Sequence, residues 1–451
     1  MKIVVNGCGK IGSTIVRALT IEGHDVVTVD MDPARINEIT GTYDVMGIVG
    51  NGGSPDILKE CGAGDCDVFI SVVSSDEINM LACFFARRMG AKHTVARIRD
   101  TEFSDDEKDF FRRELGLSLI INPDLLTARE IHDLLRFPSA VKVERFSNGM
   151  DMAELVLREG LMLSGLSLVR IREKFGAHIL VCCVLRGGQV IIPDGSFVLE
   201  TGDRIGITGS VNELGKFMRS ASANHKKARD IMILGGSRTA TYLAGLIING
   251  GNTVRIVERD RQKCESLCEK LPKAIVINAD GTDHDALLEE GLGTVDAFVS
   301  LTGLDEQNIL TAVHASSVAV SKSVAKVNSG TLAKMAEKIG LDTAVSPKNA
   351  VSDVVVRYVR ALNESVGSDF ETLYRVFDGQ VEAIEFRAKS DCKILKTQLK
   401  SLKTKKNILV AGIIRDGKVI IPGGSDSVLA GDRVIIIAAG QRIDTLDGIL
   451  A

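Results

Sequence analysis

Residues 3–16, "IVVNGCGKIGSTIV", join a β-branched run to a helical pattern through closely spaced glycines. The run predicts a buried strand, and the residues after it predict a helix. Gly7, Gly9 and Gly12 form the pattern G-x-G-x-x-G at the turn between them. The first glycine of this pattern allows the tight bend, the second lets the backbone approach a pyrophosphate, and the third lets the helix pack closely on the strand. The stretch therefore predicts a phosphate-binding loop, with the anion at the free N–H groups of Lys10 to Gly12.

Carboxylates follow this loop at the distance that a ribose-binding site requires. Asp30 ends the next expected strand, 18 residues after Gly12, which is close to the ~20 residues typical of a carboxylate that accepts from ribose hydroxyls. Asp32 would repel a 2′-phosphate, so the pair favours NAD or an adenosine nucleotide over NADP. Arg97 ends a later strand at the carboxyl edge of the sheet, where ligands bind; the alternative is a surface salt bridge.

Length and composition limit the class of protein. The 451 residues suggest about three or four domains of ~100–150 residues, and the scarcity of aromatic residues together with 44 glycines suits parallel sheets with short loops. A net charge of −4 argues against a basic field for nucleic acid or anionic lipid. The longest apolar runs are far shorter than the ~20 residues of a membrane span, and the N-terminus has no leader pattern. Nine cysteines without C-x-x-C pairs predict a reducing, cytoplasmic location and no metal site.

The chain contains a tandem repeat. "GCGKIG" at Gly7 has its counterpart in "GGSRTA" at Gly235, 228 positions later, and Glu258 follows Asp30 at the same distance. "CDVFISVVSSDEINML" matches "VDAFVSLTGLDEQNIL", and "GGQVIIPDGSFVLETGDRI" matches "DGKVIIPGGSDSVLAGDRV", both 229 positions later. The constant offset predicts two copies, roughly 1–222 and 228–451, joined by the polar linker "SASANHKKARD".

Each copy is expected to divide into two units. Alternating strand and helix signals predict a doubly wound, Rossmann-like parallel sheet, with expected strands at Ile3–Val5, Val26–Val29, Val45–Val49, Val68–Val73 and Val95–Ile98 in the first copy. Short strands with turn signals then predict a small, mostly β lobe of α+β class. The expected boundaries are 1–138 and 139–222 for the first copy, and 228–363 and 364–451 for the second.

A helix is expected to connect the two units of each copy. In the first copy Asn122 is the expected N-cap and Pro123 the first helical residue; Ser346 and Pro347 repeat this arrangement. In the second helix an apolar stripe at helical spacing contains Val351, Val354, Val355, Tyr358 and Leu362.

The second copy departs from the glycine pattern. Gly235, Ser237 and Ala240 replace the three glycines, so the backbone is more hindered where a pyrophosphate would lie. Glu258 keeps the ribose carboxylate, and Lys326 keeps the positive charge of Arg97. Binding of a mononucleotide, weak binding and loss of binding all stay open for this copy.

The order of nucleotide domain, β lobe, nucleotide domain and β lobe resembles the TrkA family, the cytosolic regulatory subunits of bacterial and archaeal Trk potassium-uptake systems, built of RCK (KTN) domains with TrkA-C lobes. The resemblance covers essentially the whole chain. It rests on "NGCGKIG", Asp30, "GNGGSPDILKECGAGDCDVFISVVSSDEINML", "ARIRD", "VIIPDGS…TGDRI" and "VIIPGGS…AGDRV".

The resemblance implies a homo-oligomer, a dimer or a tetramer, at the cytoplasmic face of the membrane. It implies a membrane potassium-transporting subunit as partner, no nucleic acid, no catalysis, and NAD or NADH, or ATP or ADP, as ligand. Carried over by motif, the first site comprises Gly7, Cys8, Gly9, Lys10, Ile11, Gly12, Asp30, Val73, Ser74 and Arg97. The second site comprises Gly235, Gly236, Ser237, Arg238, Thr239, Ala240, Glu258, Thr302, Gly303 and Lys326.

The alternatives are an NAD-dependent oxidoreductase of unknown substrate and a scaffold that binds no nucleotide. An oxidoreductase needs an acid or base and a substrate cavity in a further domain. The sequence shows no recognised catalytic motif, and each expected lobe is shorter than about 90 residues, which is small for a substrate domain. The sequence therefore favours a sensor over an enzyme.

Overall fold

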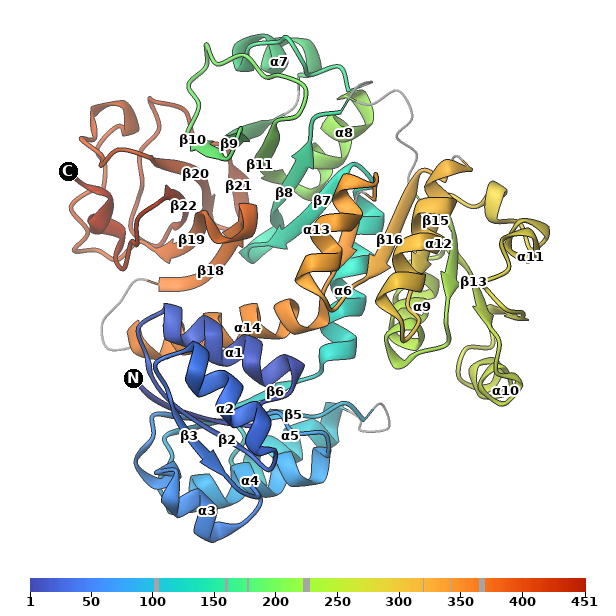
Figure 1. Cartoon of the computed structure of the whole chain (residues 1–451). Helices are drawn as coiled ribbons and strands as arrows, with labels where there is room; N and C mark the ends of the chain where they lie inside the picture. Colours follow the sequence, from blue (N-terminus) through green and yellow to red (C-terminus); the bar gives the residue numbers. More distant parts are fainter. Residues whose placement is uncertain are drawn as a thin grey trace.

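A computed structural model describes residues 1–100, 105–158, 161–176, 178–221, 228–318, 320–341, 343–364 and 370–451. It contains two parallel and two antiparallel sheets, and Figure 1 shows them as four units arranged around two central helices, α6 and α14. Residues 222–227, the main part of the expected linker, lie outside the described residues. Within the described ranges, every helix is too short or too polar to span a lipid bilayer.

The first unit is the predicted doubly wound sheet. Its strands are β1 (Lys2–Asn6), β2 (Asp25–Asp30), β3 (Met46–Val49), β4 (Val68–Ser71), β5 (His93–Arg97) and β6 (Leu119–Ile121), in the spatial order β3-β2-β1-β4-β5-β6. Its helices are α1 (Lys10–Ile21), α2 (Pro33–Thr42), α3 (Pro55–Glu60), α4 (Asp76–Met89) and α5 (Asp105–Glu114). Strand β6 was not predicted, because three residues are too few to show a pattern.

The third unit repeats this architecture and confirms the tandem duplication. Its strands are β12 (Asp230–Leu234), β13 (Thr253–Glu258), β14 (Ile275–Asn278), β15 (Ala297–Ser300), β16 (Lys322–Lys326) and β17 (Thr343–Val345), in the order β14-β13-β12-β15-β16-β17. Its helices are α9 (Arg238–Asn249), α10 (Arg261–Lys270), α11 (His284–Glu289), α12 (Asp305–Ser317) and α13 (Gly330–Lys338). The strand order is that of a sheet that binds ligands at its carboxyl edge.

Both lobes are mostly β, as predicted, and the structure shows that their sheets are antiparallel. The first contains β7 (Ala140–Arg145), β8 (Met150–Val156), β9 (Ile179–Arg186), β10 (Gln189–Ile191) and β11 (Arg204–Ser210), with α7 (Leu168–Phe175) and α8 (Val211–Ala221). The second contains β18 (Phe370–Val376), β19 (Val381–Arg387), β20 (Ile408–Arg415), β21 (Lys418–Ile420) and β22 (Arg433–Ala439). One face of each sheet packs on the other lobe, and both lobes contribute to a shared core that includes Met152, Cys183, Phe377 and Ile435.

The connecting helices are exchanged between the copies. Helix α6 (Pro123–Arg136) packs against α9 of the second copy, and α14 (Pro347–Glu364) packs against α1 of the first. Figure 1 shows α14 lying along α1 and α6 lying beside α9. Val351 and Val355 of the predicted stripe are fully buried in the core of the first nucleotide domain, together with Val359. The stripe predicted from sequence is therefore one of the contacts that join the halves.

The N-termini of these helices differ in one detail from the prediction. Asn122 caps α6, since its side chain accepts a hydrogen bond from the N–H of Leu125 at 3.0 Å. Helix α14 begins at Pro347, as predicted. Ser346 occupies the predicted N-cap position, since its carbonyl oxygen accepts from the N–H of Ala350 at 3.1 Å. Its hydroxyl, however, is buried and has no hydrogen-bond partner among the described residues, so it does not repeat the side-chain cap of Asn122.

Reciprocal polar contacts hold the two lobes together. Glu154 accepts hydrogen bonds from Arg204 of its own lobe at 2.8 Å and from the N–H of Phe377 in the other lobe at 3.3 Å. Glu385 accepts in the same way from Arg433 and from the N–H of Ser147, both at 3.2 Å. Both glutamates are buried, so each needs these donors. Because a glutamate of each lobe accepts from a backbone N–H of the other, the same contact occurs twice across the lobe interface, as in a two-fold symmetric dimer.

A buried ion network connects the first nucleotide domain to the second lobe. Glu22 is the C-cap residue of α1, and its side chain is 4% exposed; its carboxylate contacts Arg360 of α14 at 2.6 Å and also contacts Arg375. Arg360 contacts Glu382 of β19 at 2.8 Å. Burial on its own raises the pKa of Glu22, but the hydrogen bond and charge of Arg360 outweigh it and hold that pKa below its ordinary value. Gly250 occupies the corresponding C-cap of α9, so the second copy has no equivalent carboxylate.

A buried lysine joins the second nucleotide domain to the first lobe. The ammonium of Lys322 at the start of β16 donates to the carbonyl oxygen of Ala140 and to the Thr343 hydroxyl, both at 2.6 Å. Burial lowers the pKa of Lys322 from 10.5 to about 7. The described residues place no carboxylate on this ammonium, so its charge is held by neutral oxygens alone.

This environment predicts a pH dependence of stability. Between pH ~7 and ~10 the unfolded chain keeps the Lys322 proton while the folded chain releases it, so the free energy of unfolding should rise with pH in that range. Lys322→Met should remove this rise. The measurement is urea unfolding of both proteins at several pH values; parallel pH profiles for the two would contradict the buried, uncompensated amine.

Candidate functional site

The three glycines of the first loop have different structural roles. Gly7 has φ +102°, and a Cβ on Gly12 would lie 1.7 Å from the carbonyl oxygen of Gly7, so any larger residue at position 12 would break the strand–helix junction. Gly9 has an ordinary φ of −68°, and a Cβ there would meet only the Arg35 guanidinium, at 3.9 Å. Gly9 is therefore not required by the fold, and it leaves open space in front of α1.

The start of α1 is available to an anion. Gly9 is its N-cap and has no side chain to accept from the first N–H groups, and the first turn contains no acidic residue. In the second copy Ser237 takes this place and accepts from the N–H of Ala240 at 3.3 Å. The free N–H groups and positive end of α1 thus face the loop, whereas α9 is partly capped by its own chain.

The two ribose carboxylates lie against their loops in the same way. Asp30 accepts from the N–H of Cys8 at 2.6 Å and from the N–H of Asp32 at 2.9 Å. Glu258 accepts from Gly236 at 2.7 Å and from Asp260 at 2.9 Å. Each carboxylate therefore fixes its glycine loop, besides the role toward ribose that sequence predicted.

Asp32 has a role that the sequence analysis did not foresee. Its carboxylate caps α2 by accepting from the N–H of Ala34 at 2.9 Å, and it pairs with Arg35 at 3.4 Å. Arg35 also lies 3.7 Å from Asp30. This cation offsets part of the repulsion expected for a 2′-phosphate, and selection of NAD over NADP stays a prediction.

An asparagine that sequence analysis missed organises the carboxyl edge of each sheet. Asn79 accepts from the N–H of Val73 at 2.9 Å and donates to the carbonyl oxygens of Val73 at 3.1 Å and Arg97 at 2.9 Å. Asn308 makes the same contacts with Thr302 and Lys326 in the second copy. Its signal was present in the repeat, since "DEIN" at 76–79 and "DEQN" at 305–308 share the asparagine.

Arg97 is buried at this edge, and no carboxylate of the described residues forms a salt bridge with it. It is 7% exposed, and its Nε and one terminal nitrogen have no hydrogen-bond partner within the described chain. Burial lowers its pKa, and the nearby cation Arg99 lowers it further. The alternative of a surface salt bridge is therefore wrong. Nitrogen donors that are buried and unpaired are costly to maintain, and such a guanidinium is suited to a bound anion.

The first site lies next to the second copy. The Thr239 hydroxyl in the first turn of α9 donates to Asp124 at 2.8 Å, and Arg99 contacts the other oxygen of Asp124 at 3.0 Å. Arg238 of the same turn lies close enough to lower the pKa of Arg97. Arg238 and Thr239, which sequence assigned to the second site, therefore contact or approach the edge of the first.

The remaining residues assigned to the second site stay on their own domain. Lys326 donates to the carbonyl oxygen of Leu301 at 3.3 Å, and burial lowers its pKa. The Gly235 loop, Glu258 and Thr302 line the edge of the second sheet, and open space surrounds Gly303. The two sheet edges thus share the hydrogen bonds between a glycine loop and its carboxylate. They differ in their charged residues and in whether a side chain caps the first helix.

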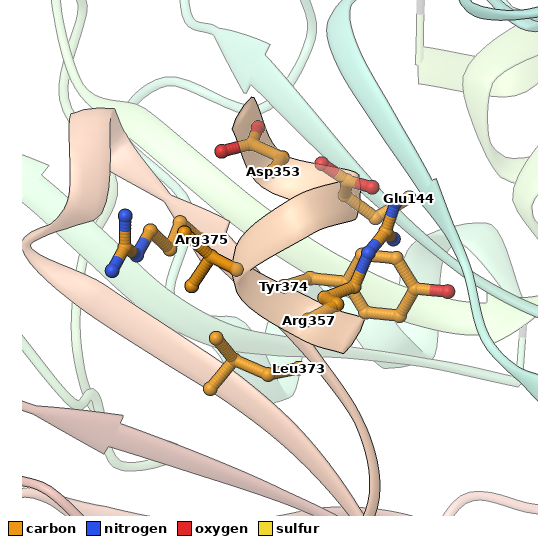
Figure 2. Close-up of a pocket in the computed structure, with 7 residues that line it drawn as sticks. Glu144, Asp353, Arg357, Leu373, Tyr374 and Arg375 are labelled. Atoms are coloured by element: carbon orange, nitrogen blue, oxygen red, sulfur yellow. The ribbon is translucent and has the colours of Figure 1, made fainter. Parts of the chain in front are cut away.

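Figure 2 shows a pocket elsewhere, at the junction of α14, β7 and β18. Charged side chains line it, among them Glu144, Asp353, Arg357 and Arg375. The Lys142 ammonium donates to Glu144 and to the carbonyl oxygen of Arg375, both at 2.8 Å. No residue of either glycine loop lines this pocket. We interpret it as a packing junction of three units.

Family models match nearly all of this architecture. The TrkA-N domain matches residues 3–123 and 231–347, and the TrkA-C domain matches residues 152–222 and 383–451. The chain is 30% identical to the "Trk system potassium uptake protein TrkA homolog 1" of Methanosarcina mazei, with 99% of each chain covered. It is 29% identical to the "Trk system potassium uptake protein TrkA" of Haemophilus influenzae, covering 98% of this chain and 96% of that protein.

Solved structures share the fold of the whole chain. The GsuK RCK domain superposes with a TM-score of 0.63 at 15% identity, covering 97% of this chain and 92% of that one. The GsuK channel bound to NAD gives a TM-score of 0.62 at 14% identity, covering 97% and 77%. At such identities the similarity establishes the arrangement of the four units and nothing about ligands.

The glycine geometry predicts opposite outcomes for two substitutions. Gly9→Val should fold with an unchanged melting temperature but weaken NAD binding at least ~10-fold, because its side chain occupies the space in front of α1. Gly12→Ala should lose about 3 kcal/mol of stability or more, because its Cβ clashes with backbone. Calorimetric titration with NAD and thermal unfolding measure both; undiminished binding by Gly9→Val would remove α1 from the site.

Proposed function

Since this chain belongs to the TrkA family, we propose that it is a nucleotide-sensing regulatory subunit that gates potassium uptake through a Trk-type membrane transporter. Its ligand is NAD or NADH, or ATP or ADP, and it acts as a homo-oligomer on the cytoplasmic face of the membrane. The partner proposal rests on relatives named potassium uptake proteins. The ligand proposal rests on the glycine loop and on a channel of the same fold, GsuK, solved with NAD bound.

Arg97 is the observation that carries this proposal. Its buried, unpaired donors sit at the same sheet edge as the open N-terminus of α1 and the Asp30 carboxylate. Together these groups offer a cradle for phosphate, a carboxylate for ribose hydroxyls and a cation for a further anionic group. We propose the first-copy residues named above as the principal site. The second set, with Ser237 capping α9, is proposed as the weaker one.

The same geometry supports sensing by rearrangement of the paired nucleotide domains. A ligand on α1 contacts a helix whose other end, Glu22, is bound to Arg360 of α14 and through it to Glu382 of the second lobe. A ligand shifts such an equilibrium only by its different affinity for the two arrangements. A coupling of about 1–3 kcal/mol would change the ratio of open to closed partner five- to 150-fold.

We also propose that the units divide at 138/139, near 222–228 and at 363/364.

The oxidoreductase alternative has less support. A substrate domain would have to be one of the two lobes, and these are packed on each other through one shared core. Incubation of the purified protein with NADH and candidate substrates would reveal turnover as a loss of absorbance at the band of the reduced nicotinamide.

Charge removal at the two sheet edges tests which copy carries the site. Arg97→Gln should abolish the thermal stabilisation by NAD, NADH, ATP or ADP, whichever of them stabilises the wild type. The matched change Lys326→Gln should keep most of it, because Lys326 is bonded to its own domain. A panel of melting temperatures decides the question. Equal loss in both variants would assign the signal to both copies, and no stabilisation of the wild type by any nucleotide would favour a scaffold.

The ion network predicts that a variant can bind nucleotide normally and yet fail to pass the resulting structural change to the second lobe. Glu22→Gln should keep nucleotide affinity within about twofold while removing the ligand-dependent change of amide hydrogen exchange in β19 and β22. Glu38→Gln, an exposed change on the same domain, is the control. If Glu22→Gln responds as the wild type does, the route through Arg360 is not used.

A further inference from the structure

The second lobe has a lysine-rich outer surface that the proposed function does not use. Residues 393–406 form the larger part of the connection between β19 and β20, which spans 388–407; they contain six lysines and no acidic, arginine or aromatic residue, and Lys389 and Asp391 precede them. The lysines are Lys393, Lys396, Lys400, Lys403, Lys405 and Lys406, and all six are exposed. None forms a salt bridge with another residue of the described chain. The net charge of −4, from which we expected no basic field, hides this local concentration.

Residues 393–406 form a packed layer of the second lobe. Its apolar residues Ile394, Leu395 and Leu399 pack on the face of the second sheet that carries Phe386 and Ile436. The opposite face of that sheet packs on the first lobe. With its apolar side chains directed to the sheet, the segment carries its lysines on the side that faces away from the rest of the molecule.

Backbone hydrogen bonds hold this layer in place. The backbone N–H of Lys396 donates to the carbonyl oxygen of Val428 at 2.8 Å, and that of Lys400 donates to the carbonyl oxygen of Gly424 at 2.9 Å. The backbone N–H of Lys405 donates to the carbonyl oxygen of Ile449 at 2.8 Å, next to the C-terminus marked in Figure 1. The backbone that carries these lysines is therefore held in place on the lobe.

The first lobe provides an internal comparison. Helices α7 and α8 cover the same face of its sheet. On α7, Glu173 lies between Arg172 and Lys174, and on α8 the Lys216 ammonium pairs with Glu213 at 2.7 Å. Charges of both signs thus cover the first lobe, so the fold itself does not require a basic layer.

We propose that this lysine surface binds the anionic headgroups of a lipid bilayer. Protein–protein interfaces are enriched in aromatic residues and arginine and depleted in lysine, and they need buried anchors. The described residues of the second lobe expose no large apolar side chain. Lysine ammonium groups are hydrated point charges. A cluster of four to eight such basic residues, without an apolar anchor, is suited to the diffuse negative charge of an anionic bilayer surface. This inference does not rest on the proposed nucleotide response, since it concerns a different unit.

Sedimentation of the full chain with lipid vesicles tests this proposal. The wild type should bind vesicles of phosphatidylcholine mixed with phosphatidylglycerol, and not vesicles of phosphatidylcholine alone. Raising salt from ~0.1 M to ~1 M shortens the screening length from ~10 Å to ~3 Å and should release it. The triple variant Lys400→Gln, Lys403→Gln, Lys406→Gln should bind about 100-fold more weakly, at about fivefold per charge.

A matched variant separates this surface from net charge. Lys263→Gln, Lys270→Gln, Lys273→Gln removes three exposed lysines on or beside α10 and should bind vesicles as the wild type does. Equal melting temperatures establish that both variants fold. Binding that is equal for the two variants, or equal for anionic and neutral vesicles, would overturn the proposal. Tighter binding to duplex DNA than to the anionic vesicles would overturn it in favour of nucleic acid.

Discussion

The exchange of α6 and α14 between the two copies is the contact on which the rest of the structure depends. Each nucleotide domain leaves the outer side of its first helix apolar, and the connecting helix of the other copy covers it. Fully burying a valine contributes about 1.5–3 kcal/mol, and α14 alone buries Val351, Val355 and Val359. Separating the halves would expose these residues. The two copies must therefore move as a coupled pair.

Duplication within one chain has allowed the two copies to differ in chemistry while sharing a backbone. Gly9 leaves the start of α1 open, whereas Ser237 caps α9. Glu22 ends α1 in an ion network, whereas Gly250 ends α9 without a charge. These differences all lie on the first helix of each sheet. The copy that keeps an open phosphate loop is also the one whose helix contacts the opposite lobe through buried charges.

Much of this could be predicted from the sequence, because local patterns carry it. The constant offset between "GCGKIG" and "GGSRTA" predicted both sheets, and helical spacing predicted the buried stripe of α14. The partner of that stripe could not be predicted, since an apolar face does not say which surface covers it. Likewise, the pattern around Arg97 placed it at the sheet edge, but not the approach of Arg238 of α9, which lies more than 100 residues away in the sequence. The Asn79 contacts were missed because the shared asparagine was treated as part of a repeat.

The ion network of Glu22 contributes more to fixing the position of α1 relative to the second lobe than to the free energy of unfolding. Removing two charges from water costs several kcal/mol per ion, and the attraction between them only offsets this when donors and acceptors are fully matched. Here Arg360 is held by two carboxylates from different units, Glu22 at 2.6 Å and Glu382 at 2.8 Å, and both it and Glu22 are nearly inaccessible to water. A shift of α1 by one turn would leave those charges buried and unpaired, which is far costlier than breaking an apolar contact of the same size. The network thus permits few positions of α1 relative to the second lobe. Because α1 is a helix of 12 residues with its open end at the phosphate loop, a ligand that moves this end must either move the lobe or break the pairing.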